Sequence, residues 1–326
     1  MQDVQIKSIE QVDPEAAAAL LRSVMGDHFG REKSAALWNW KHRSNPAGAS
    51  LGLAAYDSEG MLIALRTFMR WRLVDDAGGE VSAVRAVDAA VHPKWRRRGL
   101  FSRLTQQSLD QLQDFGVGLV FNTPNNRSGP GNKKMGWHLL GHPNLWVKLR
   151  PGALWASGRL DDGAVLEGLR PFNQHGSQLA TMTPEAAPRG GLAVLKDAAF
   201  LDWRYGQHPN LAYSIVKSPA GVALVRQDKR RGRMGVAVVD WFLYEDNLSA
   251  FRALLRSVSE QTHGDYWIME PLTKSPLRGA VILRGFIPVP WRNVNLAARP
   301  VCMSGGAAVF QRRTAWQLNL GDLETF

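Results

Sequence analysis

Short apolar runs in the first half of the chain alternate with polar turns and amphipathic stretches, a pattern that predicts a mixture of strands and helices. Runs at 51–56 and 61–73 indicate two strands, and the polar tetrapeptide Asp57-Ser58-Glu59-Gly60 between them predicts a hairpin turn. The alanine-rich segment 14–25 follows Asp13, which suits a helix N-cap. A second, shorter helix is expected at 34–40, since Asn45-Pro46 disfavours helix beyond it.

The segment 84–104, VRAVDAAVHPKWRRRGLFSRL, combines a buried strand, a basic loop and the start of a helix. Its first eight residues are apolar apart from Arg85 and Asp88, as in a central strand. The loop Arg96-Arg97-Arg98-Gly99 carries three cations and a glycine, where backbone can approach a ligand closely. A helix over 100–115 would direct its free N–H groups at this loop, and such a terminus suits phosphate. We therefore predict a pyrophosphate site built from backbone amides.

The remaining elements of the first half are two strands, at 117–122 and 139–149, and the second half repeats the same order. Trp40–Pro46 and Trp203–Pro209 share the pattern Trp-[Lys/Arg]-x-x-x-[Asn/His]-Pro and lie half a chain length apart. Three further parallels follow in the same order. Strand 234–243 and helix 248–262, with the glycine that stops it, correspond to the central strand and the helix after it. Strand 266–271 corresponds to the strand at 117–122, and Gly285-Phe286 corresponds to Gly136-Trp137. Four parallels in one order indicate an internal duplication. A linker is expected near 151–162.

Composition limits the class of protein and the kind of partner. The 326 residues are 45% hydrophobic and 21% charged, which is typical of a folded chain with room for two domains. One cysteine excludes an internal disulfide and a cysteine-based zinc site, and it fits the reducing cytoplasm. We expect no metal, no signal peptide and no membrane span.

The net charge of +11 favours an anionic partner such as CoA, a nucleotide-linked sugar, RNA or a lipid surface. The basic residues are dispersed, and no nucleic-acid motif accompanies them, so a nucleic-acid module is the weakest interpretation. The basic run at 229–233 is interpreted as a hairpin turn between two strands.

The segment Arg96-x-x-Gly99-x-Phe101 resembles the acetyl-CoA-binding segment of GNAT N-acetyltransferases, whose usual form is Gln/Arg-x-x-Gly-x-Gly/Ala. Phe101 departs from that form, and its side chain must turn away from the cofactor. The order of elements and the tandem layout are similar to a bacterial two-domain GNAT subfamily associated with polysaccharide or envelope biosynthesis. The resemblance implies an α+β fold with two tandem GNAT-like domains, each a mixed, mostly antiparallel sheet flanked by helices. We place them at 1–150, with the acyl-CoA loop, and at 151–326, with a degenerate loop.

The same resemblance implies that acetyl-CoA or a longer acyl-CoA is the co-substrate. Loop amides would hold its pyrophosphate, the edge of the central strand would pair with the pantetheine amides, and asparagines after the next strand would contact the pantetheine arm. A plain turn is the alternative for Asn125-Asn126. The residues predicted to bind the cofactor are Val87, Ala89, Arg96, Arg97, Arg98, Gly99, Leu100, Phe101, Ser102, Asn122, Asn125 and Asn126.

Acyl transfer to an amine requires one proton to leave the nitrogen and one to reach the sulfur. Asp88 is the candidate base, because burial in an apolar strand would raise the proton affinity of its carboxylate. The alternative is a buried salt bridge with Arg85 or another arginine. His92 is titratable, although it precedes Pro93 and suits a role in the turn. The family's usual acid is a tyrosine, but residues 122–150 contain none, which leaves Ser128 or a water.

The second half lacks a glycine at the equivalent turn, and Glu245 and Asp246 there would repel a pyrophosphate. One active site is therefore expected, in the first half. Trp38, Trp40 and Trp203 suit either sugar stacking or core packing; the core interpretation is favoured because the element recurs where the loop is absent.

The leading interpretation is an enzyme, an acyl-CoA-dependent N-acyltransferase acting on a small-molecule primary amine such as an amino sugar. The alternatives are an aminoacyl-tRNA-dependent transferase, which would not need the CoA loop, and a non-catalytic CoA-binding protein. The oligomeric state is left open.

Overall fold

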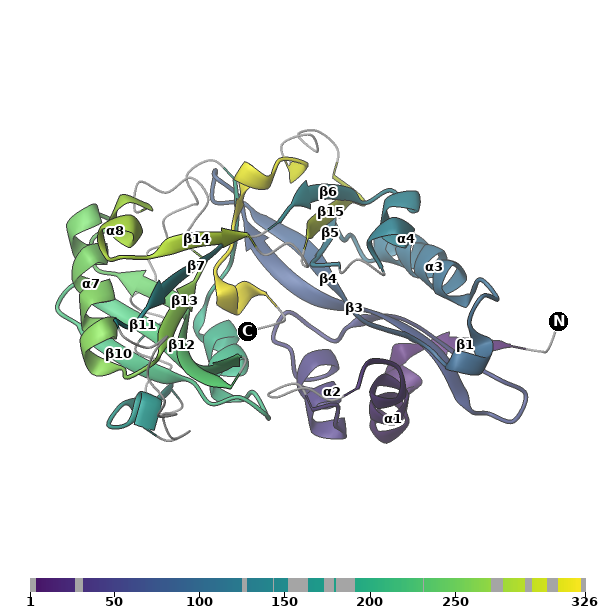
Figure 1. The fold of residues 1–326 in the computed structure, drawn as a ribbon. Helices are drawn as coiled ribbons and strands as arrows, with labels where there is room; N and C mark the ends of the chain where they lie inside the picture. The colour runs from purple at the N-terminus through teal and green to yellow at the C-terminus, as the bar shows by residue number, and fades with distance from the viewer. Residues whose placement is uncertain are drawn as a thin grey trace. The chain divides into compact units, whose positions relative to one another are not determined.

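A computed structural model describes residues 4–26, 32–124, 128–142, 144–151, 164–172, 179, 191–230, 232–270, 278–290, 295–303 and 310–323 of the 326-residue chain. The chain forms two compact units. Unit 1 comprises Met1–Gly141, Gln207–Asn210 and Asn295–Arg312, and unit 2 comprises His142–Gly206, Leu211–Val294 and Arg313–Phe326. A mixed sheet flanked by helices lies at the centre of each unit (Figure 1), so the expected α+β class is confirmed.

The sheet of unit 1 contains one parallel pair, β4–β5, along its main path, and the other neighbours are antiparallel. Its strand order is β1 (Gln5–Ser8), β2 (Leu51–Tyr56), β3 (Leu62–Val74), β4 (Glu80–Val91), β5 (Leu119–Asn122), β15 (Leu296–Pro300) and β6 (His138–Gly141).

The helices of unit 1 cover both faces of this sheet (Figure 1). On one face, α1 (Pro14–Met25) and α2 (Ala35–His42) enclose an apolar cluster with β3. On the other, α3 (Leu100–Asp114) packs on β2 and β3. Asp13 and Ser34 cap α1 and α2 by accepting amide hydrogens from the first turns, as expected for Asp13. The short α4 (Gly129–Lys134) follows β5.

The sheet of unit 2 repeats this plan, with β12–β13 as its one parallel pair along the main path. Its strand order is β14 (Ile287–Pro290), β7 (Asn144–Leu149), β13 (Tyr266–Met269), β12 (Arg233–Leu243), β11 (Gly221–Arg230), β10 (Ser214–Ser218) and β8 (Arg170–Pro171). Unit 2 also contains the helix α7 (Leu248–Gln261) and the shorter helical segments α6 (Ala198–Leu201), η5 (Asp202–Gly206), α8 (Arg278–Leu283), η6 (Arg313–Ala315) and η7 (Leu320–Asp322).

The prediction of one strand over 139–149 is wrong. Gly141, with φ of 93°, ends β6 in the first sheet, and β7 then lies in the second sheet between β13 and β14. In return, β15 comes from the second half of the chain and lies in the first sheet between β5 and β6. The two halves therefore exchange one strand, so neither sheet is built from one half alone.

Two local predictions are confirmed by the described residues. Arg230 pairs with Arg233 at the end of the β11–β12 hairpin, so the basic run lies at a turn. Trp38, Trp40 and Trp203 are at most 8% exposed, which supports the core interpretation of the tryptophan element. The expected linker lies outside the described residues beyond Pro151.

Candidate active site

The central strand of unit 1 diverges from its parallel neighbour. The β4–β5 ladder runs from Ala83↔Leu119 to Arg85↔Phe121 and then stops, whereas β4 continues to Val91 along β3. Over that last stretch, the side of β4 that faced β5 has no ladder partner in the described part of the chain. This arrangement leaves an opening in which the backbone of an added ligand could pair with β4.

A bulge distorts β4 beside this opening. The β3–β4 register shifts between Thr67↔Val87 and Leu65↔Ala90, so Asp88 and Ala89 together lie opposite one residue, Arg66. Asp88 adopts a φ of 40°, an uncommon backbone conformation for a residue other than glycine. Val87 is held by the ladder and by a hydrogen bond from the Thr67 hydroxyl to its carbonyl. Strain and an unpaired edge therefore coincide at one position of the strand.

The basic loop leads from β4 into α3 through two left-handed residues, Arg97 with φ of 63° and Gly99 with φ of 76°. Gly99 is the N-cap and provides no side-chain cap, and the first helical bond runs from Arg103 N to the Gly99 carbonyl. The amides of residues 100–102 therefore have no acceptor within the helix. A Cβ at Gly99 would meet no atom within 4 Å, so the loop backbone faces open space. This geometry suits an anion bound by amides.

Most side chains around the loop are exposed, and one is buried. Those of Arg96, Arg97, Arg98 and Ser102 are exposed, whereas Leu100 is buried. The Arg96 Nε donates to the Val91 carbonyl at 3.3 Å, and the Arg98 guanidinium lies 4.6 Å from the centre of the Trp95 ring.

Phe101, which replaces the family's small residue, is half-buried. Its ring lies 5.4 Å from the guanidinium carbon of Arg66, and a Cβ built on Gly131 of α4 would be 3.5 Å from its Cε1. The ring thus turns towards β3 and α4.

The remaining predicted binding residues lie near the end of β5. Asn122 is buried at the last position of that strand, and its Oδ1 has no hydrogen-bond partner in the described structure. Ser128 precedes α4, and its carbonyl accepts from Asn132 N. Asn125 and Asn126 lie outside the described residues. An unpaired acceptor at Asn122 is suited to receive an N–H from a ligand in the opening.

His92 follows β4 directly. Its amide donates to the Ile63 carbonyl at 2.8 Å, which ties the turn to β3. Its Nδ1 is buried without a hydrogen-bond partner among the described groups.

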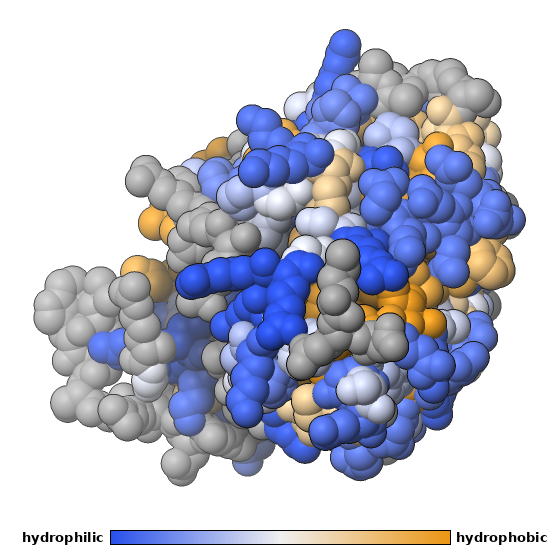
Figure 2. Space-filling view, turned by 90° about the vertical axis from the view of Figure 1, so that its right-hand side faces the viewer, coloured by the Kyte–Doolittle hydropathy of each residue, from blue (hydrophilic) through white to orange (hydrophobic). Residues whose placement is uncertain are grey.

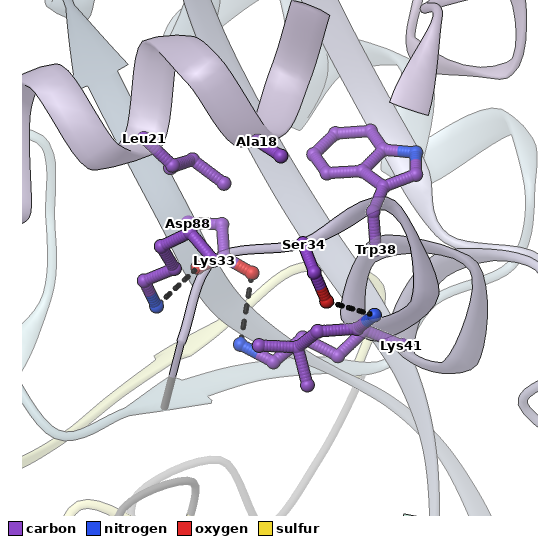
Figure 3. Close-up of a pocket in the computed structure, with 8 residues that line it drawn as sticks. Ala18, Leu21, Lys33, Ser34, Trp38, Lys41 and Asp88 are labelled. Carbon is purple, nitrogen blue, oxygen red and sulfur yellow. Dashed lines mark hydrogen bonds and ion pairs between the residues drawn. The ribbon is translucent and has the colours of Figure 1, made fainter. Parts of the chain in front are cut away.

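Asp88 lies in a buried cluster of cations at a pocket between α1, α2 and β4 (Figure 3). Its carboxylate is 2.9 Å from Lys41 Nζ, 3.2 Å from His42 Nε2 and 3.8 Å from Lys33 Nζ. Burial raises the pKa of Asp88, but the charge of Lys41, the hydrogen bond with His42 and the charge of Lys33 together hold it well below its ordinary value. The expected rise in proton affinity is therefore wrong. The alternative of a buried salt bridge is confirmed, but the arginine expected as its partner is wrong, because Lys41 and Lys33 provide the charges.

The cluster continues from His42 to Ser50, whose Oγ lies 2.9 Å from the His42 Nδ1. The set Ser50, His42 and Asp88 has the composition of a nucleophilic triad. Ser50 is only 1% exposed, however, so its hydroxyl does not reach a substrate. We interpret the chain of contacts as a fixed internal network that holds α2 against β4.

Unit 2 contains the same cluster at equivalent positions. Asp240 takes the place of Asp88, since both lie three residues beyond the last parallel ladder pair of the central strand. Lys196 Nζ is 2.7 Å from the Asp240 carboxylate, and the Tyr205 hydroxyl donates to it at 2.9 Å. Lys196 corresponds to Lys33 and Tyr205 to His42, because each pair is separated by the same number of residues as Trp40 and Trp203.

Sequence reasoning missed this duplicated cluster, although the repeat spacing could have revealed it. It also missed Arg66, whose environment becomes evident only when β3 and α3 are placed together.

The described residues contain no group of three or more His, Cys, Asp or Glu that could hold a metal ion. Nor does any helix within the described ranges have the length and apolarity to cross a membrane. The face drawn in Figure 2 is mainly hydrophilic, with smaller apolar areas between the polar side chains.

Comparison with known proteins finds a domain model that matches the first part of the chain and solved structures that share the fold. Residues 5–140 match the model of the acetyltransferase (GNAT) domain. No curated protein sequence matches the chain.

Three solved structures share the fold over most of the chain. A probable N-acyltransferase from Enterococcus faecalis V583 is 15% identical, with a TM-score of 0.63 over 92% of this chain and 73% of its own. Eis1 from Mycobacterium abscessus is 17% identical, with a TM-score of 0.59 over 94% of this chain and 76% of its own. A GCN5-related N-acetyltransferase from Anabaena variabilis is 13% identical, with a TM-score of 0.60 over 91% of this chain and 73% of its own.

Proposed function

We propose that unit 1 is an acyl-CoA-dependent N-acyltransferase that acts on a primary amine, because residues 5–140 match the model of the acetyltransferase (GNAT) domain. One observation carries the proposal: the β4–β5 opening leads directly to a helix whose N-terminus is left uncapped by Gly99. The resemblance favours an amino sugar of polysaccharide or envelope biosynthesis as the small-molecule acceptor. The lone cysteine supports a cytoplasmic location.

The residues of the opening fit an extended ligand that carries amides at one end and phosphates at the other. The free edge of β4 at Val87 and Ala89 offers backbone groups to the pantetheine amides, and Asn122 Oδ1 offers an acceptor. The first-turn amides of α3 and the cations Arg96–Arg98 receive the pyrophosphate. The bound co-substrate would supply a thioester, whose thiolate is a good leaving group.

Proton handling in this proposal does not rest on Asp88. A carboxylate whose pKa is depressed by Lys41 and His42 is a weak base, so we assign Asp88 to holding α2 against the strained bulge. His92, with its unpaired Nδ1, and Ser128 remain the candidates for exchanging a proton with the reacting groups. Holding the amine beside the thioester supplies the larger part of the acceleration.

Unit 2 is proposed to bind no cofactor. Its helix α7 is capped by the side chain of Asn247, which accepts from Ala250 N, and Glu245 lies beside that cap. Where β12 and β13 separate, other segments of unit 2 contact both strands. A Cβ at Gly321 would be 3.1 Å from the Val239 carbonyl of β12, and Arg313 pairs with Glu270, the residue after β13.

The experiment is a thermal-stability measurement with and without acetyl-CoA. A ligand that binds only the folded state raises the melting temperature. We expect a rise for the wild-type protein, and none for Gly99→Glu, which places a carboxylate at the phosphate loop. Gly60→Glu is the matched control, because Gly60 has a φ of 80° and nothing within 4 Å, like Gly99, but lies in the β2–β3 turn. A rise in Gly99→Glu equal to that of the control would contradict the site.

A second candidate is a CoA-binding protein without catalytic activity, which the lack of tyrosine in residues 122–150 favours. A panel of primary amines with acetyl-CoA decides between the two: release of free CoA with any amine supports the transferase, and tight binding without turnover supports the second candidate. Absence of binding by acetyl-CoA and longer acyl-CoAs would direct attention to the aminoacyl-tRNA alternative.

A further inference from the structure

The guanidinium of Arg66 in β3 is buried, and the described residues provide it with no counterion. The side chain belongs to a residue that is 3% exposed, and its Nε and Nη2 have no hydrogen-bond partner in the described structure. No carboxylate of the described residues forms an ion pair with it, and burial alone lowers its pKa to about 10. An isolated buried cation is costly, and such groups are normally paired. The folded chain therefore holds Arg66 in a state that a bound acceptor would relieve.

Two aromatic rings lie beside the Arg66 guanidinium. Its guanidinium carbon lies 4.7 Å from the centre of the Phe68 ring and 5.4 Å from that of Phe101. Phe101 is the second residue of α3, so Arg66 lies beneath the first turn of that helix. The Phe101 ring thus links the cation to the helix terminus that carries the positive end of the dipole. Two sources of positive potential meet there, and no anion of the described chain balances them.

Arg70, a second arginine on β3, provides a comparison, because its guanidinium does have a hydrogen-bond partner. It lies four residues further along β3, on the same face, and its guanidinium is 5.4 Å from the centre of the ring of Phe115, the C-cap residue of α3. There a cation is favoured by the negative end of the helix. Arg70 Nε also donates to the Ala49 carbonyl at 3.1 Å. The two arginines thus pack against the same helix, but only Arg66 lacks a partner and lies at the wrong pole for a cation.

We propose that Arg66 is a receptor for an oxyanion group of the acyl-CoA, with Phe101 as its covering ring. The proposal rests on the function proposed above. Two parts of the co-substrate carry this chemistry: the pyrophosphate, and a carboxylate at the end of a dicarboxylic acyl group. Arg66 lies opposite the β4 bulge, so it can serve either the phosphate end or an acyl group that folds back over the bulge. A guanidinium binds both anions through paired N–H donors.

The test is calorimetric titration of the wild-type protein, Arg66→Met, Arg66→Lys and the control Arg70→Met. The probes are inorganic pyrophosphate, acetyl-CoA and succinyl-CoA. Losing a charge-assisted hydrogen bond to a buried anion weakens binding about tenfold to a hundredfold. If the receptor takes the pyrophosphate, Arg66→Met weakens all three probes by that factor. If it takes an acyl carboxylate, only the preference for succinyl-CoA over acetyl-CoA is lost. Arg66→Lys retains the charge without the paired donors, so its loss is smaller.

A second measurement separates a receptor from a structural arginine. Because Arg66 makes no hydrogen bond or ion pair with the described residues, we expect ligand-free Arg66→Met to melt at or above the wild-type temperature. Arg70→Met should bind all three probes as the wild type does.

Two results overturn the receptor: unchanged affinity of Arg66→Met for every probe, or a lower melting temperature of its ligand-free form. If the wild type binds acetyl-CoA and Arg66→Met binds it equally, only the receptor fails. If the wild type binds none of the probes, the proposed function fails with it.

Discussion

The buried cluster around Asp88 offers a direct test of whether this aspartate supports the fold or the chemistry. Asp88→Asn removes the charge and keeps the shape, and asparagine tolerates the φ of 40° that the bulge imposes. Lys41 Nζ lies 2.9 Å from the carboxylate, and the side chains of Lys41 and Asp88 are 6% and 4% exposed. Breaking a buried pair by removing one partner costs about 3–5 kcal/mol, because the other charge is left uncompensated.

Such a loss lowers the melting temperature of a unit of this size by roughly 6–20 °C. Scanning calorimetry of the wild type and Asp88→Asn measures it, with Asp114→Asn on the exposed face of α3 as a control expected to change little. Adding Lys41→Met to Asp88→Asn should recover part of the loss, since the uncompensated lysine is then removed. A loss below about 1 kcal/mol for Asp88→Asn, combined with abolished acyl transfer, would refute the structural role and restore Asp88 as a base.

Three further predictions concern pH and packing. The depressed pKa of Asp88 stabilises the fold above its unfolded-state value of 3.8, so stability should fall as the pH drops below 3.8, and less so in Asp88→Asn; acid titration of unfolding checks this. Burial raises the pKa of Glu270 to about 7 against the opposing charge of Arg313, so the contribution of Glu270 to the free energy of unfolding should fall as the pH rises from 4.5 to 7. In Glu270→Gln this decrease in stability should be absent; the same decrease as in the wild type would contradict the prediction. A Cβ at Gly235 would lie 2.3 Å from the Tyr266 ring, so Gly235→Ala should cost about 1–3 kcal/mol in urea unfolding, and a cost near zero would contradict the packing.

Much of the fold could be predicted from local patterns. The helix caps, the hairpins and the central strand follow from short-range chemistry, in which turn residues and apolar periodicity act over a few positions. The exchange of β7 and β15 could not be predicted this way, because both strands have the apolar pattern of any sheet strand and pairing partners are chosen over long range.

The candidate site was predictable to the same extent. The loop at Gly99 was found from the types and spacing of its residues. The state of Asp88 was not, because its pKa depends on Lys33, Lys41 and His42, which the sequence places about 50 residues away. Burial was foreseen correctly, but the neighbouring charges outweigh it. Arg66 was missed for a similar reason, since an unpaired cation is recognised only once its surroundings are known.

We propose that the chain has one cofactor site, in unit 1 at the N-terminus of α3. The most direct measurement is calorimetric titration of the full chain with acetyl-CoA. We expect one molecule bound per chain for the wild type and loss of binding in Gly99→Glu, with Gly60→Glu unchanged. Two molecules bound per chain, or a single site that Gly99→Glu leaves intact, would contradict it.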